Sequence, residues 1–119
     1  MNELIDTNVL IYAFDSSDDL RAHTARTLIE KFISNKKGSV TLQILGECYA
    51  VLRKKGLPAN GCRTIFHVLR KKFACYDATE SSYEYAIELA ELYGIHFWDA
   101  LIAAVMLENA SQSKTDHHW

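Results

Sequence analysis

The chain has 119 residues and a formal net charge of −2, with 49% hydrophobic and 24% charged residues. This length allows one domain with a real core and excludes two, and the composition is that of a soluble globular protein. No apolar run approaches the roughly 20 residues of a membrane span, and the amino end lacks a secretion signal, so we expect a cytoplasmic protein without membrane contact.

The first third of the chain alternates short apolar runs with helical patterns. Leu4-Ile5 reads as the end of a buried strand, and residues 7–13 as the first turns of a helix. Residues 16–19 are of the types that favour turns and helix caps, and they precede a helix predicted over 19–35. A short strand with β-branched residues is expected at 39–41. The helix is predicted from apolar residues at i, i+3 and i+4 spacing: Ala22, Ala25, Leu28, Ile29, Phe32 and Ile33.

The middle third predicts two helices and a strand. The first helix covers about 43–55, after which Gly56 fits a left-handed position and Pro58 the first turn of the next helix. A third short strand is expected at 74–76. The apolar stripe of the second helix consists of Cys62, Ile65, Phe66, Leu69 and Phe73.

The last third predicts two more helices and a tail. Ser81 and Glu84 have the spacing of a capping box, and Gly94 closes the helix that follows. The last helix covers about 97–109, and residues 111–119 form an atypical polar tail. Because strands and helices alternate, we expect an α/β fold in a single domain over 1–119, with a small parallel sheet flanked by helices on both faces.

The three cysteines do not form a recognisable metal or disulfide pattern. Cys48, Cys62 and Cys75 are odd in number, widely spaced and without a C-x-x-C pair. Buried free thiols are therefore expected rather than a zinc site or a disulfide framework.

Three acids interrupt otherwise apolar stretches, namely Asp6, Glu47 and Asp99. A carboxylate in such a position disfavours burial, and carboxylate oxygens are the ligands that hard divalent cations prefer, so together they suggest a metal site. Each acid alone has a simpler explanation. Asp6 could cap the following helix, Glu47 could be a solvated surface residue, and Asp99 could be a favourable charge at a helix start.

The segments around these acids resemble the PIN-domain family. The resemblance is carried by residues 4–12 (LIDTNVLIY), 43–47 (QILGE) and 90–102 (AELYGIHFWDALI), in the family's order and spacing. Within the family the chain is most similar to the VapC-type ribonuclease toxins of type II toxin–antitoxin systems. The resemblance implies a PIN-like fold over nearly the whole chain.

It also implies a metal-dependent endoribonuclease that hydrolyses RNA phosphodiester bonds with Mg²⁺ or Mn²⁺. Asp6, Glu47 and Asp99 fall on the family's first three acids as catalytic and metal-binding residues, with Glu47 acting directly or through a water. Thr7 and Asn8 fall on the polar pair that orders the site. The resemblance further implies a homodimer inhibited by a cognate antitoxin protein.

The carboxyl end departs from the family pattern. The family continues with an apolar strand and a motif that supplies a fourth acid, whereas residues 111–114 have no apolar content. Either Asp116 reaches the site by a shortened route, or the fourth position is empty and the C-terminal strand is missing. His117 and His118 could bind a softer metal or lie in a terminal tail. The alternative function is a truncated PIN domain, weakly active or inactive, that acts as a protein-interaction module.

The basic residues are clustered at 36–37, 53–55 and 70–72, with Arg63 between the last two clusters. For a single cluster, the simplest explanation is a solvated surface placed favourably against a helix dipole. Together the clusters could hold a phosphate backbone without reading its sequence.

Overall fold

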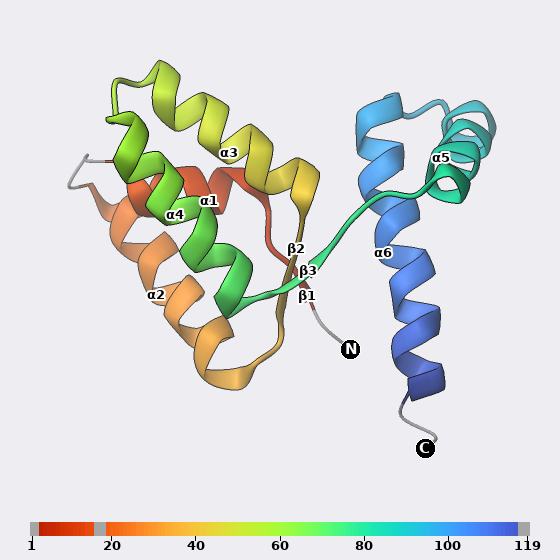
Figure 1. Cartoon of the computed structure of the whole chain (residues 1–119), viewed down its shortest axis with the longest axis horizontal. Coiled ribbons are helices and arrows are strands. Elements are labelled where there is room, and N and C mark those ends of the chain that lie inside the picture. Colours follow the sequence, from red (N-terminus) through yellow and green to blue (C-terminus); the bar gives the residue numbers. More distant parts are fainter. Residues whose placement is uncertain (1–2, 16–18, 117–119) are drawn as a thin grey trace. The chain divides into compact units, whose positions relative to one another are not determined.

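The structure is a computed structural model that describes the backbone of residues 3–15 and 19–116, and the side chains of these residues up to 110. These residues form three strands and six helices (Figure 1). The α/β fold class is therefore confirmed, with a small parallel sheet. In chain order the elements are β1 (Glu3–Leu4), α1 (Thr7–Phe14), α2 (Leu20–Asn35), β2 (Gly38–Thr41), α3 (Leu42–Lys54), α4 (Ala59–Lys72), β3 (Ala74–Tyr76), α5 (Glu80–Tyr93) and α6 (Phe97–Asp116).

The chain divides into two compact units, one over residues 2–75 and one that begins at residue 76. The amino-terminal unit holds β1 to α4 and most of β3, and the carboxy-terminal unit holds α5 and α6. Each unit has its own buried cluster and is described by itself. That both belong to a single domain stays a prediction.

The sheet has the order β1-β2-β3, and β1 pairs with β2 in parallel. Glu3 lies opposite Gly38 and Leu4 opposite Ser39. The backbone N–H of Ile5 donates to the carbonyl of Ser39 at 2.9 Å, and the Ser39 hydroxyl donates to the carbonyl of Glu3 at 3.1 Å. Since parallel neighbours end at the same edge of a sheet, α1 and α3 both begin at this edge.

Gly38 is buried where β2 passes close to two apolar side chains. A Cβ atom at this position would lie 2.6 Å from Cδ1 of Phe73 and 2.9 Å from Cδ1 of Ile5. Both distances are shorter than a carbon–carbon contact allows. Only glycine therefore lets Ile5 and Phe73 pack over the start of β2.

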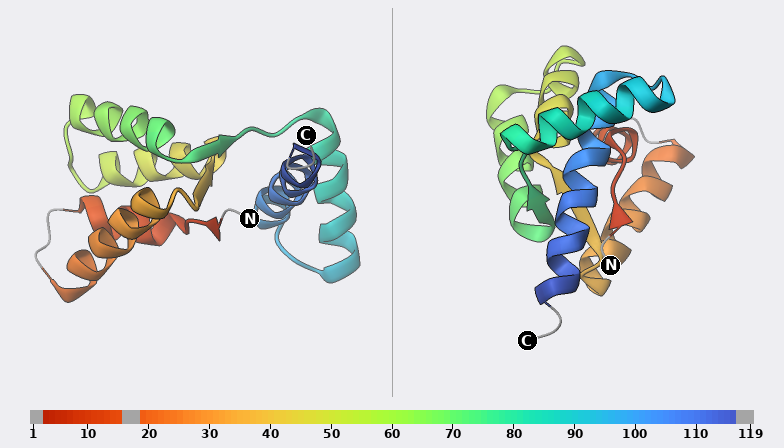
Figure 2. Two further views of the ribbon diagram at one scale, coloured as in Figure 1. Left: turned by 90° about the horizontal axis from the view of Figure 1, so that it is seen from below. Right: turned by 90° about the vertical axis from the view of Figure 1, so that its right-hand side faces the viewer.

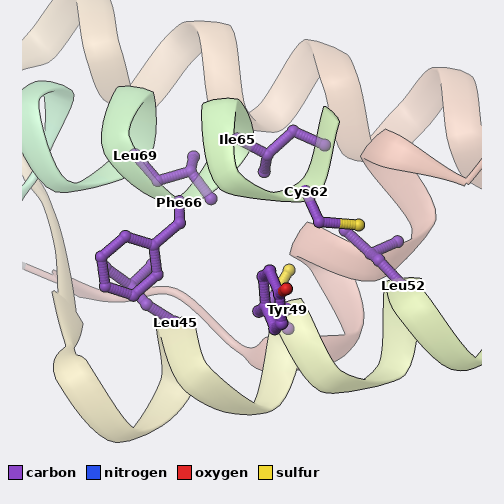
Figure 3. Close-up of a pocket in the computed structure, with 8 residues that line it drawn as sticks. Leu45, Tyr49, Leu52, Cys62, Ile65, Phe66 and Leu69 are labelled. Atoms are coloured by element: carbon purple, nitrogen blue, oxygen red, sulfur yellow. The ribbon is translucent and has the colours of Figure 1, made fainter. Parts of the chain in front are cut away.

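The helices of the amino-terminal unit form two pairs, α1 with α2 and α3 with α4 (Figure 2, left). The starts of α2 and α3 are fixed locally, because Asp19 accepts a hydrogen bond from the N–H of Ala22 at 2.9 Å and Thr41 accepts one from Ile44 at 3.1 Å. Apolar side chains of α3 and α4 face each other along a closed seam (Figure 3). The seam is lined by Leu45, Cys48, Tyr49, Leu52, Cys62, Ile65, Phe66 and Leu69.

The carboxy-terminal unit is built by α5 packing on α6. Its buried centre consists of small and medium side chains: Ala86, Ala100, Leu101, Ala104 and Val105. Small residues allow the two helix backbones to approach closely. Within the described part of the chain, no helix has the length and apolar character needed to cross a membrane.

The ends of three helices differ from the sequence predictions. The capping box of α5 is formed by Thr79 and Ser82, not by Ser81 and Glu84, because the helix already begins at residue 80. Pro58 is the N-cap of α4 rather than part of its first turn.

The predicted end of the last helix at residue 109 is also wrong. The backbone of α6 is helical as far as Asp116, and the polar residues 111–116 contain neither Gly nor Pro to stop a helix. Residues 111–116 therefore belong to α6 in the described part of the chain, and the absence of the family's C-terminal strand stays a prediction. His117 and His118 lie outside the described residues.

Within the described residues, none of the three cysteines is in a disulfide, as predicted. Cys48 and Cys62 are buried in the α3–α4 seam, whereas Cys75 is partly exposed. Burial raises the pKa of the Cys48 thiol from 9.0 to about 11, and the neighbouring Cys62 adds to the increase. A thiol that stays protonated is a poor nucleophile and a poor metal ligand.

Replacing Gly38 with Ala should destabilise the chain by roughly 1–3 kcal/mol, because the added methyl group overpacks the contact with Phe73 and Ile5. Gly46→Ala is the matched control. Nothing lies within 4 Å of a Cβ atom at Gly46, and Ala favours a helix interior, so stability should rise by about 0.5–1 kcal/mol. Urea unfolding measures both changes, and equal effects of the two variants would contradict the close approach at Gly38.

The Cys48 thiol should make stability fall as the pH rises from about 9 to 11. The pKa in the folded state is raised to about 11, so the unfolded chain loses its proton first and unfolding becomes more favourable, by up to about 2–3 kcal/mol. The slope of unfolding free energy against pH should be shallower in Cys48→Ala than in the wild type. Equal slopes would show that the thiol is not held protonated.

Candidate functional site

Asp6 lies at the junction between β1 and α1. The residue before it, Ile5, and the helix residue Leu10 are both buried, while the Asp6 side chain is exposed. Asp6 is the N-cap of α1, and its Oδ1 accepts a long hydrogen bond of 3.4 Å from the N–H of Asn8. The capping role considered from sequence is therefore real, but one weak bond leaves most of the carboxylate's acceptor capacity facing solvent.

Glu47 lies in α3, directly after the neighbouring strand β2. Its Oε2 accepts a hydrogen bond from the Thr7 hydroxyl at 3.4 Å, across 40 residues of sequence. Its Oε1 accepts one from Nε2 of Gln43 at 3.2 Å, one helical turn earlier. The parallel pairing of β1 and β2 thus brings the start of α1, with Asp6 and Thr7, beside the exposed carboxylate of Glu47.

Two uncharged donors, Thr7 and Gln43, hold the Glu47 carboxylate in this arrangement. The sequence predicted Thr7 as a site-ordering residue, and the hydrogen bond shows how it could act. Gln43 was missed as a contributor, although the i, i+4 spacing of Gln43 and Glu47 on one helix was a usable signal. Neither donor neutralises the carboxylate, so its charge stays available to a cation.

Asp99 lies in the first turn of α6, in the carboxy-terminal unit, and its side chain is exposed. The backbone N–H of Ala100 donates to the carbonyl of His96 at 2.9 Å, which marks the start of the helix. A negative charge in this first turn is favoured by the helix dipole. The convergence of Asp99 with Asp6 and Glu47 stays a prediction.

The fourth acid also stays a prediction. Asp116 is the last residue of α6, where the backbone is helical, and its side chain lies outside the described ones. Within the described residues of either unit, no three His, Cys, Asp or Glu side chains form a group that could hold a metal ion. Of the proposed ligands, Asp6 and Glu47 lie in the amino-terminal unit.

A further carboxylate, Glu108 on α6, has a structural role that the sequence did not reveal. It accepts hydrogen bonds from the hydroxyls of Ser81 and Ser82 in the first turn of α5, the first of them at 2.7 Å. Ser82 is buried and also completes the capping box with Thr79. Glu108 therefore ties α6 to the start of α5.

An open groove of about 310 Å³ lies between α1 and α2, with a mostly apolar lining that includes Val9, Tyr12 and Leu28. The Arg21 guanidinium at its rim lies 5.3 Å from the centre of the Tyr12 ring and is paired with Asp19 at 3.6 Å. This chemistry does not suit a metal ion or a phosphate. The exposed oxygens of Asp6 and Glu47 are the better candidate for chemistry on a charged substrate.

The sequence of the chain matches the model of a known protein family. The model of the PIN domain matches residues 4–113, which is most of the chain. The chain belongs to the PIN-domain family. PIN domains are generally nucleases that hydrolyse phosphodiester bonds, and they typically use divalent metals.

Solved structures support the fold of this PIN domain. A chain described as a toxin-antitoxin complex from Klebsiella pneumoniae matches with a TM-score of 0.69 and 19% sequence identity. The match covers 92% of this chain and 81% of that one. A comparison with curated proteins gives no match. At this identity the likeness shows that the two chains share a fold.

Proposed function

We propose that this PIN domain is a metal-dependent endoribonuclease of the VapC toxin type, with Asp6, Glu47 and Asp99 as its catalytic residues. The observation that carries the proposal is the hydrogen bond from Thr7 to Glu47, which joins the start of α1 to α3. It joins Thr7, the residue directly after Asp6, to Glu47 on a separate element, and so supports a site that contains both acids. Among the described residues, both carboxylates are exposed and receive their hydrogen bonds from neutral donors, so no basic side chain offsets their charge.

The chemistry of the donors fits Mg²⁺ or Mn²⁺. Asp6 and Glu47 offer hard, exposed oxygens, and among the described side chains neither a thiol nor an imidazole is hydrogen-bonded to them. Asp99 is the proposed third ligand and Asp116 a candidate fourth, with Glu47 binding directly or through a water. When bound, such an ion polarises a phosphoryl oxygen and lowers the pKa of the attacking water.

The chain's own residues have distinct tasks in this proposal. Thr7 and Gln43 restrict the Glu47 carboxylate so that it can orient the attacking water and accept its proton. The N–H of Asn8 holds one oxygen of Asp6 and leaves the other free. Positioning of this kind is effective because the groups are in place before the substrate arrives.

The alternative is an interaction module with little or no activity. The observation that favours it is the helical backbone of residues 111–116, where the family has the strand that precedes its fourth acid. A site with three acids would hold the metal less tightly than one with four. The two proposals share the fold and differ in whether RNA is cut.

The proposal includes a cognate antitoxin as protein partner, a homodimeric state and a cytoplasmic location. The support for the antitoxin is the shared fold with a chain from a toxin-antitoxin complex.

Wild-type protein should cleave RNA with Mg²⁺ or Mn²⁺, and Asp6→Asn and Glu47→Gln should each lower the rate by about 100-fold or more, because each removes a charged ligand. Thr7→Val should lower it by about 10-fold, since it frees Glu47 without removing a charge. Gel-based cleavage assays measure the rates, and isothermal titration with Mn²⁺ should show weaker binding for Asp6→Asn and Glu47→Gln.

The control is Glu30→Gln, which neutralises an exposed acid on α2 outside the proposed site. It should leave cleavage and Mn²⁺ binding unchanged. A wild type that is inert with both metals would refute the nuclease and leave the interaction module. Asp116→Asn tests the fourth position, because full activity in this variant would remove Asp116 from the site.

Expression of the wild type in a bacterial host should arrest growth, and Asp6→Asn should not, since the arrest requires RNA cleavage. Co-expression of the proposed cognate antitoxin, to be sought as a small gene beside this one, should restore growth, and the two proteins should co-elute from a sizing column. Growth arrest by Asp6→Asn equal to that by the wild type would contradict a toxin that acts through this site.

A further inference from the structure

The charge of the chain is strongly segregated. Residues 48–76 hold seven of its 13 Lys and Arg residues and none of its 15 Asp and Glu residues. The rest of the chain therefore carries six basic against fifteen acidic residues. Although the net charge of the chain is only −2, residues 48–76 form a basic segment. It contains the carboxy-terminal half of α3, all of α4 and all of β3.

Four residues of α4 form what we call the α4 basic face, namely Arg63, His67, Arg70 and Lys71. At 100° per residue they fall within an arc of about 100°, on the side of the helix away from the α3–α4 seam. All four side chains are exposed. The face runs over about 12 Å, because eight residue steps of 1.5 Å separate Arg63 from Lys71.

Neighbouring acids do not neutralise this face. The structure pairs Lys55 with Asp15 at 3.4 Å, and among the described side chains it gives no ion pair to the four residues of the α4 basic face. His67 is held by an edge contact with the Phe66 ring, at 5.6 Å between ring centres. The positive charges therefore face solvent.

Helix stability explains only part of the pattern. Arg70 and Lys71 lie in the last turn of α4, where the helix dipole favours cations. Arg63 is the fifth residue of the helix, in its amino-terminal half, where a positive charge gains nothing from the dipole. Its position on the same arc points to a role outside the helix.

The α4 basic face is separate from the acids. On α3, Glu47 lies roughly opposite the residues that face α4, such as Leu45 and Leu52, as expected from the 100° helical step. The α4 basic face in turn lies on the outer side of α4. The two charged surfaces of this unit are thus divided by the α3–α4 seam.

We propose that the α4 basic face binds the sugar–phosphate backbone of single-stranded RNA, as a holding surface apart from the acids; this rests on the proposed function. No large apolar side chain of α4 falls within this arc, and polar Asn60 and Thr64 flank its charged residues. Arg, Lys, Thr and Asn are the residues that contact nucleic-acid backbones, whereas protein interfaces have an apolar centre. The face therefore suits RNA better than an acidic protein.

The test measures RNA binding without cleavage, by fluorescence anisotropy of a labelled single-stranded RNA in EDTA with the full-length Asp6→Asn protein. Adding Arg63→Gln and Lys71→Gln should weaken binding by about 10-fold at 0.1 M salt. The slope of log K against log salt should fall by roughly one for each phosphate contact removed. The matched control adds Arg21→Gln and Lys31→Gln, which remove the same charge on α2, outside the basic clusters, and should change affinity less than twofold.

The α4 basic face is refuted as an RNA surface if the control weakens binding as much as the Arg63 and Lys71 variant, or if Asp6→Asn does not bind RNA. It is also refuted if poly-glutamate binds the face as tightly as the RNA, because an acidic protein is then the better partner. Thermal unfolding excludes a folding defect. These outcomes are independent of the nuclease assay. If the wild type does not cleave RNA but the α4 basic face binds it, the nuclease is refuted and the RNA-binding surface is supported.

Discussion

The candidate site depends on the parallel pairing of β1 with β2, and this pairing depends on the absence of a side chain at Gly38. The register places Glu3 opposite Gly38, and Ile5 and Phe73 close over the glycine. Both strands then end at one edge of the sheet, so α1 and α3 begin side by side. The hydrogen bond between Thr7 and Glu47 is a consequence of this register, because a shift of one residue would turn every strand side chain to the other face.

The acids of the site contribute little to holding the fold together. Asp6 and Glu47 are exposed, and long bonds to neutral donors at an exposed surface add only tenths of a kcal/mol. Stability comes instead from the apolar α3–α4 seam and from the α5–α6 contact with its serine–glutamate link. This separation lets the carboxylates keep their charge for a cation, since nothing in the fold requires them to be neutralised.

Local signals predicted most of the helices and strands, whereas long-range contacts were beyond the sequence. Asp19 and Gly94 cap their helices by bonds within one turn, so residue type and spacing sufficed. The capping box of α5 was misplaced because two Ser and one Thr compete within four residues. The end of α6 was misplaced because the polar residues 111–116 suggested a non-helical tail. A polar segment without Gly or Pro can remain helical. The contacts of Glu108 with α5 cross 26 and 27 residues and left no local trace.

Some of the basic residues have a local explanation within their own helix, and others do not. Basic residues at the ends of α3 and α4 have a sufficient local explanation in the helix dipole, and each cluster alone would require nothing more. Arg63 does not fit that explanation, and neither does the lack of any acid between residues 48 and 76. A surface helix normally mixes both signs, because i, i+4 ion pairs offset the repulsion of like charges. The α4 basic face keeps that repulsion, which a polyanion lying along the helix would relieve.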